Sequence, residues 1–283
     1  MMDDERQLPS HSPLGRSSDY PDRYDAGLLF PMQRTASRQS LGLVHGQPLP
    51  FSGIDRWHAW EISWLDPHGK PQVAIGRFDI PADSVCMVES KSLKLYLNSY
   101  NNERMVSREA VRALIETDLS AACQSGVMVE LYALDALPTQ AWTQLDALPG
   151  DSIDAPELHF DCYQPDASLL SAGGDPVEEC LRSDLLKTNC PVTLQPDWAT
   201  LMVRYRGPRI DREGLLRYVV SFRNHADFHE HCVERIYMDL LQRCRPERLT
   251  VNALYTRRGG LDINPWRSNF EQPDARFVKL ARQ

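Results

Sequence analysis

The stretch SREAVRALIETDLSAACQSGV, residues 107–127, predicts a helix that runs into a strand. Ser107 is a favoured N-cap and Glu109 stands in the first turn, while Gly126 follows the expected end of the helix at Ala122. Apolar residues at positions 111, 114, 115 and 119 recur at helical spacing and would bury one face of the helix. The chain then becomes apolar and extended over residues 127–134, which predicts a strand.

Outward from this stretch, the same plan recurs about 120 residues later. In the first half, the turn Asp66-Pro67-His68-Gly69 joins expected strands over residues 56–64 and 72–80, and a helix is expected over residues 92–100. In the second half, strands are expected over 179–186, 199–206 and 248–256, and helices over 211–223 and 227–243. Two helices beside an antiparallel sheet in each half predict an α+β protein built from two similar modules.

Turn-forming residues mark the expected boundaries between these parts. Residues 1–50 are rich in Ser, Pro, Arg and Asp and predict an irregular N-terminal arm. A linker is expected at residues 148–152, so the first module would span residues 51–148 and the second residues 149–283. The segment 171–176, which contains two glycines and a proline, predicts a loop inside the second module.

Composition excludes several classes of function. The chain has 283 residues and a net charge of -8, which would repel a phosphate backbone, so stable nucleic-acid binding is not expected. Its start lacks the basic and apolar regions of a secretion signal, and no stretch approaches the ~20 apolar residues of a membrane span. Seven cysteines without a Cys-x-x-Cys pair favour free thiols in a reducing compartment. A cytoplasmic protein with no membrane partner is therefore expected.

One thiol stands close in sequence to one carboxylic acid. Cys190 precedes Pro191, which keeps its backbone out of the helical region, and Asp197 follows seven positions later. Covalent addition to an electrophilic carbon requires a nucleophile and a proton donor of this kind. Two questions stay open. Cys190 is either this nucleophile or a small buried apolar residue, as most cysteines are. Lys187 is either a cation that lowers the pKa of the thiol or a solvated side chain.

Three segments, taken together, resemble a known family. They are ESKSLKLY at residues 89–96, the segment with Cys190 and Asp197, and DFHEHC at residues 227–232. In this order they resemble the NADPH-dependent 7-cyano-7-deazaguanine reductases, the nitrile reductases of queuosine biosynthesis, in their longer two-module form. The resemblance runs from about residue 20 to the C-terminus. It implies a tandem tunnelling fold (T-fold), a homodimer, and reduction of a nitrile on a 7-deazapurine to a primary amine.

The resemblance also implies a role for each matching residue. Cys190 would add to the nitrile as a thioimide, Asp197 would protonate nitrogen, and His229 would order the substrate and aid proton movement. Substrate binding falls to Val88, Glu89, Ser90, His229 and Glu230, and NADPH binding to Ser90, Lys91, Arg258 and Gly259. The sequence itself contains no Gly-x-Gly-x-x-Gly, so the cofactor follows from the resemblance alone.

Other interpretations compete with this one. A zinc-dependent cyclohydrolase of the same fold would use His229, His231 and Cys232, but residues two apart on a helix point roughly 160° apart, so no metal site is expected. A non-catalytic purine-binding protein would need Glu230 without the pair of Cys190 and Asp197. For Glu89 and Glu230, a carboxylate at a helix start is also explained by the helix dipole alone.

Overall fold

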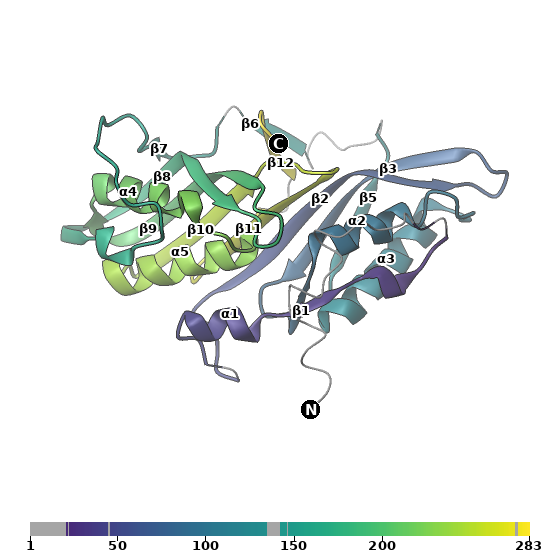
Figure 1. The fold of residues 1–283 in the computed structure, drawn as a ribbon, viewed down its shortest axis with the longest axis horizontal. Helices are drawn as coiled ribbons and strands as arrows, with labels where there is room; N and C mark the ends of the chain where they lie inside the picture. The colour runs from purple at the N-terminus through teal and green to yellow at the C-terminus, as the bar shows by residue number, and fades with distance from the viewer. Residues whose placement is uncertain (1–20, 22, 45, 135–141, 146, 275–276) are drawn as a thin grey trace.

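An eight-stranded sheet runs through the whole molecule. The computed structural model describes residue 21 and residues 23–44, 46–134, 142–145, 147–274 and 277–283. The strands lie in the order β5-β3-β2-β11-β10-β9-β8-β7, and a separate pair, β6 with β12, lies beside this sheet. In Figure 1 the first half of the chain is on the right and the second half on the left.

The first half follows the predicted plan. Strands β2 (Ser52–Leu65) and β3 (Pro71–Pro81) form a hairpin whose turn is closed by a hydrogen bond of 2.9 Å from the Asp66 amide to the Lys70 carbonyl. Strand β4 (Cys86–Val88) leads into α2 (Ser90–Asn98), and α3 (Arg108–Cys123), capped by Ser107, leads into β5 (Met128–Tyr132). These elements match the expected strands and helices to within a few residues.

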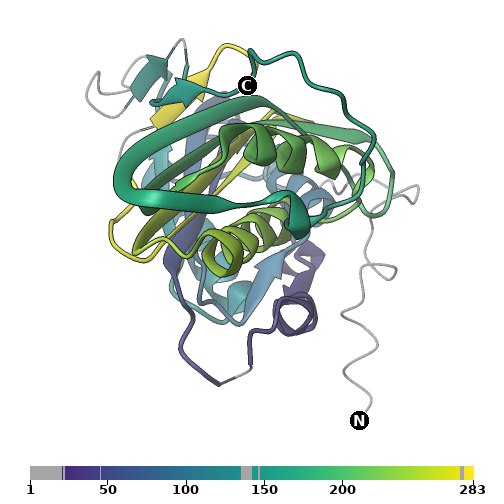
Figure 2. The ribbon, with the colours of Figure 1, turned by 90° about the vertical axis from the view of Figure 1, so that its left-hand side faces the viewer.

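The second half has the same arrangement. A long hairpin of β8 (Ala172–Asn189) and β9 (Pro196–Ile210) is followed by α4 (Arg212–Ser221), α5 (His229–Cys244) and β10 (Arg248–Tyr255). Figure 2, which faces this half, shows the curved hairpin beside the two green helices. Short elements complete it: β7 (Asp151–Ser152) pairs with β8, and β6 (Trp142–Leu145) pairs with β12 (Phe277–Leu280).

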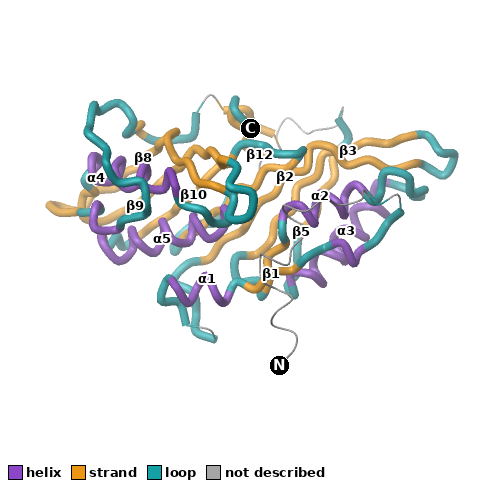
Figure 3. The backbone as a smooth tube through the Cα atoms, in the orientation of Figure 1, coloured by secondary structure: helices purple, strands orange, loops and turns teal. Residues whose placement is uncertain are grey.

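Strand β11 (Leu261–Ser268) joins the two halves, because it pairs with β10 on one side and with β2 on the other. The four long helices lie along one side of the strands (Figure 3). One apolar core packs α2 and α3 against the first half of the sheet, and a second packs α4 and α5 against the other half. No helix in the described part of the chain is long and apolar enough to span a membrane.

Two expectations were wrong in detail, and one long strand was not expected. The segment 171–176 is not a loop, because β8 begins at Ala172 and a bulge between Gly173 and Pro176 absorbs the turn-forming residues. The expected irregular arm contains β1 (Pro31–Gln33) and α1 (Thr35–Ser40), while residues 1–20 lie outside the described part. Strand β11 was missed. All seven cysteines are free.

Candidate active site between the two halves

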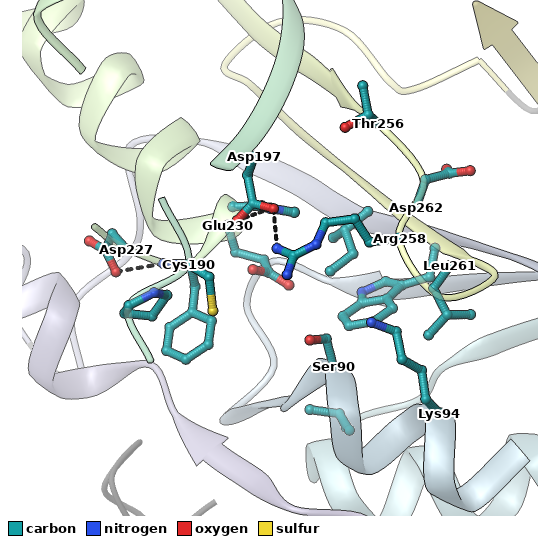
Figure 4. A pocket seen from close by; sticks show the side chains of 16 residues that line it. Ser90, Lys94, Cys190, Asp197, Asp227, Glu230, Thr256, Arg258, Leu261 and Asp262 are labelled. Carbon is teal, nitrogen blue, oxygen red and sulfur yellow. Dashed lines mark hydrogen bonds and ion pairs between the residues drawn. The ribbon is translucent and has the colours of Figure 1, made fainter. Parts of the chain in front are cut away.

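A cavity lies where the two halves meet, next to the start of α5. Seven of the ten predicted site residues line it: Val88, Ser90, Cys190, Asp197, His229, Glu230 and Arg258. Figure 4 shows the Arg258 guanidinium beside Asp197, with Cys190 to one side and Ser90 and Lys94 on α2 to the other. Glu89, Lys91 and Gly259 are neighbours of lining residues in the sequence but do not line this cavity. The site is thus assembled from both halves.

Cys190 lies in the loop that joins β8 to β9. Its amide donates to the Gln195 carbonyl at 2.9 Å, and its carbonyl accepts from the Leu194 amide at 3.0 Å, so the loop is closed upon itself. The Thr193 amide lies 3.5 Å from Sγ and donates to the sulfur. Cys190 is 7% exposed and lines the cavity. Lys187 instead donates to Asn189 and to the Arg223 carbonyl.

Asp197 stands on β9 and is buried between two cationic or ionisable partners. Its Oδ2 lies 3.3 Å from His229 Nε2, and its Oδ1 accepts from Arg258. Burial alone would raise the pKa of Asp197, but the hydrogen bond and charge of His229, followed by those of Arg258, outweigh burial and lower it. The carboxylate is therefore ionised at neutral pH, which is the form that has a free site for a proton.

His229 and Glu230 are the first residues of α5. The His229 ring stacks on Tyr255 with ring centroids 3.7 Å apart, which fixes the ring while Nε2 points to Asp197. Glu230 is 2% exposed. Burial first, and then the Asp55 carboxylate, raise the pKa of Glu230, while His229 and Arg34 oppose that rise. A carboxylate buried here is suited to accept hydrogen bonds from a ligand that carries N–H donors.

Glu89, which was expected to bind the substrate, lies at the start of a helix. It is the N-cap of α2, and its carboxylate accepts from the Lys91 amide at 2.7 Å and the Ser92 amide at 2.8 Å. Burial raises the pKa of Glu89, although these hydrogen bonds oppose the effect. In the free protein, Glu89 therefore acts as a carboxylate at a helix start. Its neighbours Val88 and Ser90 line the cavity.

Arg258 begins the tight turn between β10 and β11. The Arg258 amide donates to the Leu261 carbonyl at 2.8 Å, and Gly259 and Gly260 both have positive φ, at 59° and 81°, as a type I′ turn requires. A Cβ on Gly259 would lie 3.1 Å from Cε of Lys94, so glycine allows this close approach. A second cavity adjoins the first here and is lined by Lys94, Gly259 and Gly260 among others.

Lys94 and Trp57 are among the residues of the cavity wall that sequence reasoning missed. Lys94 lines both cavities, and its position four residues after Ser90 on α2 was a signal that the two side chains share one helix face. Burial first, and then Arg258, lower the pKa of Lys94. Trp57 lines the first cavity from β2, and its indole N–H has no hydrogen-bond partner among the described residues. No pattern in the sequence distinguishes Trp57 from a core residue.

The two histidines of α5 point to different partners. His229 lies against Asp197, whereas His231 contacts Ser37 at 2.7 Å through Nε2 and Asp227 at 3.2 Å through Nδ1. Within the described ranges, no group of three or more His, Cys, Asp and Glu side chains is placed to hold a metal ion.

Two family models match the chain. Residues 20–131 match the model described as "Nitrile reductase, 7-cyano-7-deazaguanine-reductase N-term", and residues 196–274 match "QueF-like protein". Among solved structures, the apo archaeosine synthase QueF-Like covers 36% of this chain and 99% of its own, at 16% identity and a TM-score of 0.31, a likeness too weak to bear on the fold.

Curated relatives match along nearly the whole chain. A protein of Burkholderia multivorans is 52% identical, covering 97% of this chain and 99% of its own length. The corresponding protein of Chromohalobacter salexigens is 53% identical, with 96% and 97% covered, and that of Bordetella pertussis is 54% identical, with 97% and 99% covered. Each is named NADPH-dependent 7-cyano-7-deazaguanine reductase. The chain therefore belongs to the family of NADPH-dependent 7-cyano-7-deazaguanine reductases.

Proposed function

We propose that this protein reduces the nitrile of 7-cyano-7-deazaguanine to the primary amine 7-aminomethyl-7-deazaguanine, a step of queuosine biosynthesis, with NADPH as reductant. The observation that carries the proposal is that Cys190, Asp197, His229 and Glu230 line one cavity between the two halves. A non-catalytic purine-binding protein would need the buried Glu230 but not a thiol beside a carboxylate.

The free site is suited to the first chemical step. The Asp197 carboxylate, ionised before substrate binds, takes the proton of the Cys190 thiol and passes it to the nitrile nitrogen as sulfur bonds to carbon, giving a thioimide. Nothing leaves in this addition, so the protein gains the full mass of the base. Arg258, which pairs with Asp197 in the free protein, has to release the carboxylate for this transfer.

The following steps need protons at the same place. NADPH, when bound, supplies the two hydrides that nitrile-to-amine reduction requires. At each reduction the substrate nitrogen takes up one proton, which the pair of Asp197 and His229 is placed to deliver. The bond between carbon and sulfur breaks once, between the two reductions, and this regenerates the thiolate. The stacked Tyr255 ring holds His229 in the orientation that this relay needs.

We place the cofactor at the second cavity, which adjoins the first at Lys94 and Leu261. Ser90 and Arg258 line the first cavity, and Lys94 lines both, so the cations of Arg258 and Lys94 are available where the two cavities adjoin. The glycine turn at Gly259 leaves room for a ligand to approach the backbone, and Lys91 lies one residue after Ser90 on α2. Cations here would bind phosphate groups through charge-assisted hydrogen bonds.

The open sheet favours a homodimer of tandem T-folds. In the part of the chain that the structure describes, strand β5 forms one edge of the sheet and β7 the other, so these strands do not close the sheet upon itself. Unpaired edges of this kind are normally covered by another element or chain, and a second copy would complete a barrel. We take residues 51–148 and 149–283 as the two modules. Light scattering that gives the mass of one chain at micromolar concentration would contradict the dimer.

Product stoichiometry tests the proposed reaction. The parent should oxidise two NADPH for each 7-aminomethyl-7-deazaguanine formed, as measured by absorbance and by chromatography of the product. Cys190→Ala should form no amine, while Cys180→Ala, which changes a cysteine outside the cavity, should match the parent. A parent that binds the base without oxidising NADPH would support the purine-binding alternative instead.

A further inference from the structure

Residues 30–38, here called the strap, cross from one half of the site to the other (Figure 1). At its start, the strap is bonded to the segment that carries Val88 and Glu89. The Glu89 amide donates to the Phe30 carbonyl at 3.0 Å, the Phe30 amide donates to Ser92 Oγ at 3.0 Å, and β1 pairs with β4 so that Pro31 lies opposite Val88.

At its far end, the strap is bonded to the first turns of α5. Arg38 makes a two-pronged contact with Glu234, at 3.0 Å from Nε and 2.7 Å from Nη2. Ser37 Oγ lies 2.7 Å from His231 Nε2. Helix α5 begins with His229 and Glu230, so these contacts fix the part of the helix that faces the cavity.

Between these ends, the strap contributes to a buried row of alternating charges. Arg34 Nη2 lies 2.5 Å from Asp55, Asp55 lies 2.7 Å from Arg267, and Arg267 lies 2.9 Å from Glu234. The side chains of Asp55, Arg267 and Glu234 are fully buried, and that of Arg34 is 2% exposed. Burial alone would raise the pKa of Glu234, but Arg267 foremost, together with Arg38 and Arg34, lowers it to about 2.

This row of charges is not balanced. With Arg38 it holds three guanidinium groups and two carboxylates, which leaves one positive charge in excess. An uncompensated charge in a protein interior is costly. Glu230 lies four residues before Glu234, on the same face of α5, and would supply the missing negative charge. Consistent with a spare cation, Nη1 of Arg34 has no hydrogen-bond partner among the described residues.

We propose that the strap holds the two halves of the substrate site together and that Arg34 is a positioning residue, which supplies the counter-charge for the Glu230 carboxylate. This inference rests on the proposed function, because in it the charge of the Glu230 carboxylate serves to bind N–H donors of the base. Arg34 itself does not touch the substrate.

The groups around Glu230 predict the direction of each effect. Asp55 on β2 raises the pKa of Glu230, whereas Arg34 on the strap and His229 on α5 lower it; Cys232, Tyr255 and Cys123 face it as neutral groups. Loss of Arg34 should therefore raise the pKa of Glu230, and loss of Asp55 should lower it. Binding that needs the carboxylate is lost as pH falls through the pKa of Glu230. We call this loss of affinity at low pH the acid limb of the profile of Kd against pH. Loss of Arg34 should move the acid limb to higher pH, and loss of Asp55 should move it to lower pH.

The test is the Kd of 7-cyano-7-deazaguanine between pH 5 and 9, measured by calorimetry in a Cys190→Ala background that prevents covalent addition. Arg34→Gln should move the acid limb up by about one pH unit, and Arg34→Lys should restore it. Asp55→Asn should move the limb down. The control is Arg56, which neighbours Asp55 on β2 and forms an ion pair of 2.8 Å with Asp79 on β3. Arg56→Gln removes that ion pair and should leave the limb unmoved while lowering Tm.

Each outcome bears on a different claim. Shifts of the acid limb in opposite directions for Arg34→Gln and Asp55→Asn would support the inference. A general loss of stability would not move the limb up in one variant and down in the other. If Arg34→Gln does not fold, Arg34→Lys and Asp55→Asn still carry the comparison. An acid limb that stays in place in folded Arg34 and Asp55 variants would overturn it. A Cys190→Ala protein that does not bind the base at any pH would count against the proposed function instead.

Discussion

Replacing Glu230 by glutamine removes the charge that we assign to recognition of the base. Glu230 is 2% exposed, so water cannot replace a hydrogen bond that is lost there. The amide keeps one acceptor oxygen but turns an NH₂ group toward donors of the base. Truncating one partner of a buried charged hydrogen-bonded pair costs about 2 to 5 kcal/mol. At about 1.4 kcal/mol per tenfold, the Kd should weaken roughly 30- to 5,000-fold.

The assay is calorimetric titration of Cys190→Ala and of Cys190→Ala with Glu230→Gln. A matched control is Glu213→Gln, which makes the same change in the first turn of α4, outside the cavity. If Glu230 serves only the helix dipole, both glutamine variants should lose a similar, small amount of stability and neither should lose affinity. A Kd for Glu230→Gln within about threefold of its parent would refute the assigned role.

The remaining predictions concern turnover and cofactor choice. Asp197→Asn should retain affinity for the base but lose turnover, because the amide cannot carry the proton; single-turnover rates equal to those of the parent would remove Asp197 from the mechanism. Activity should require NADPH, with NADH much poorer, because Lys91 and Arg258 are proposed to bind the 2′-phosphate; comparable kcat/KM values for the two cofactors would sink that assignment.

Local signals predicted most of the sheet and helices. The turn at Asp66 and Gly69 and the cap at Ser107 are local hydrogen-bonding devices, and each lies where the sequence indicated. Helix α3 nevertheless ends at Gln124, which adopts the left-handed conformation usually given to glycine. Local propensity does not determine that choice, because Gly126, two residues later, was equally suited.

The central strand escaped prediction for a physical reason. Strand β11 contains Pro265 and buries polar residues on the face away from the helices, among them Asp262 and Asn264. Proline is rare in a central strand, and polar residues normally indicate exposure. Asp262 is hydrogen-bonded to His58 and Trp60 on the neighbouring strand β2. No pattern in the sequence indicates these hydrogen bonds.

For the site, the sequence indicated residue types but not contacts. Cys190, Asp197, His229 and Glu230 were predicted to share one pocket, and they line one cavity. The pairing of Arg258 with Asp197 and the strap contact of Arg34 with Asp55 were not predicted. Both join residues far apart in the chain, so they depend on the tertiary fold and not on any local pattern.

The central claim is that Cys190 bonds covalently to the nitrile carbon, and intact-protein mass spectrometry tests it most directly. Mixed with 7-cyano-7-deazaguanine and no NADPH, the parent should gain the full mass of the base, and NADPH should then discharge the adduct as the primary amine. Cys232→Ala should form the same adduct and Cys190→Ala none. No adduct on the parent, or an adduct that persists in Cys190→Ala, would contradict the mechanism.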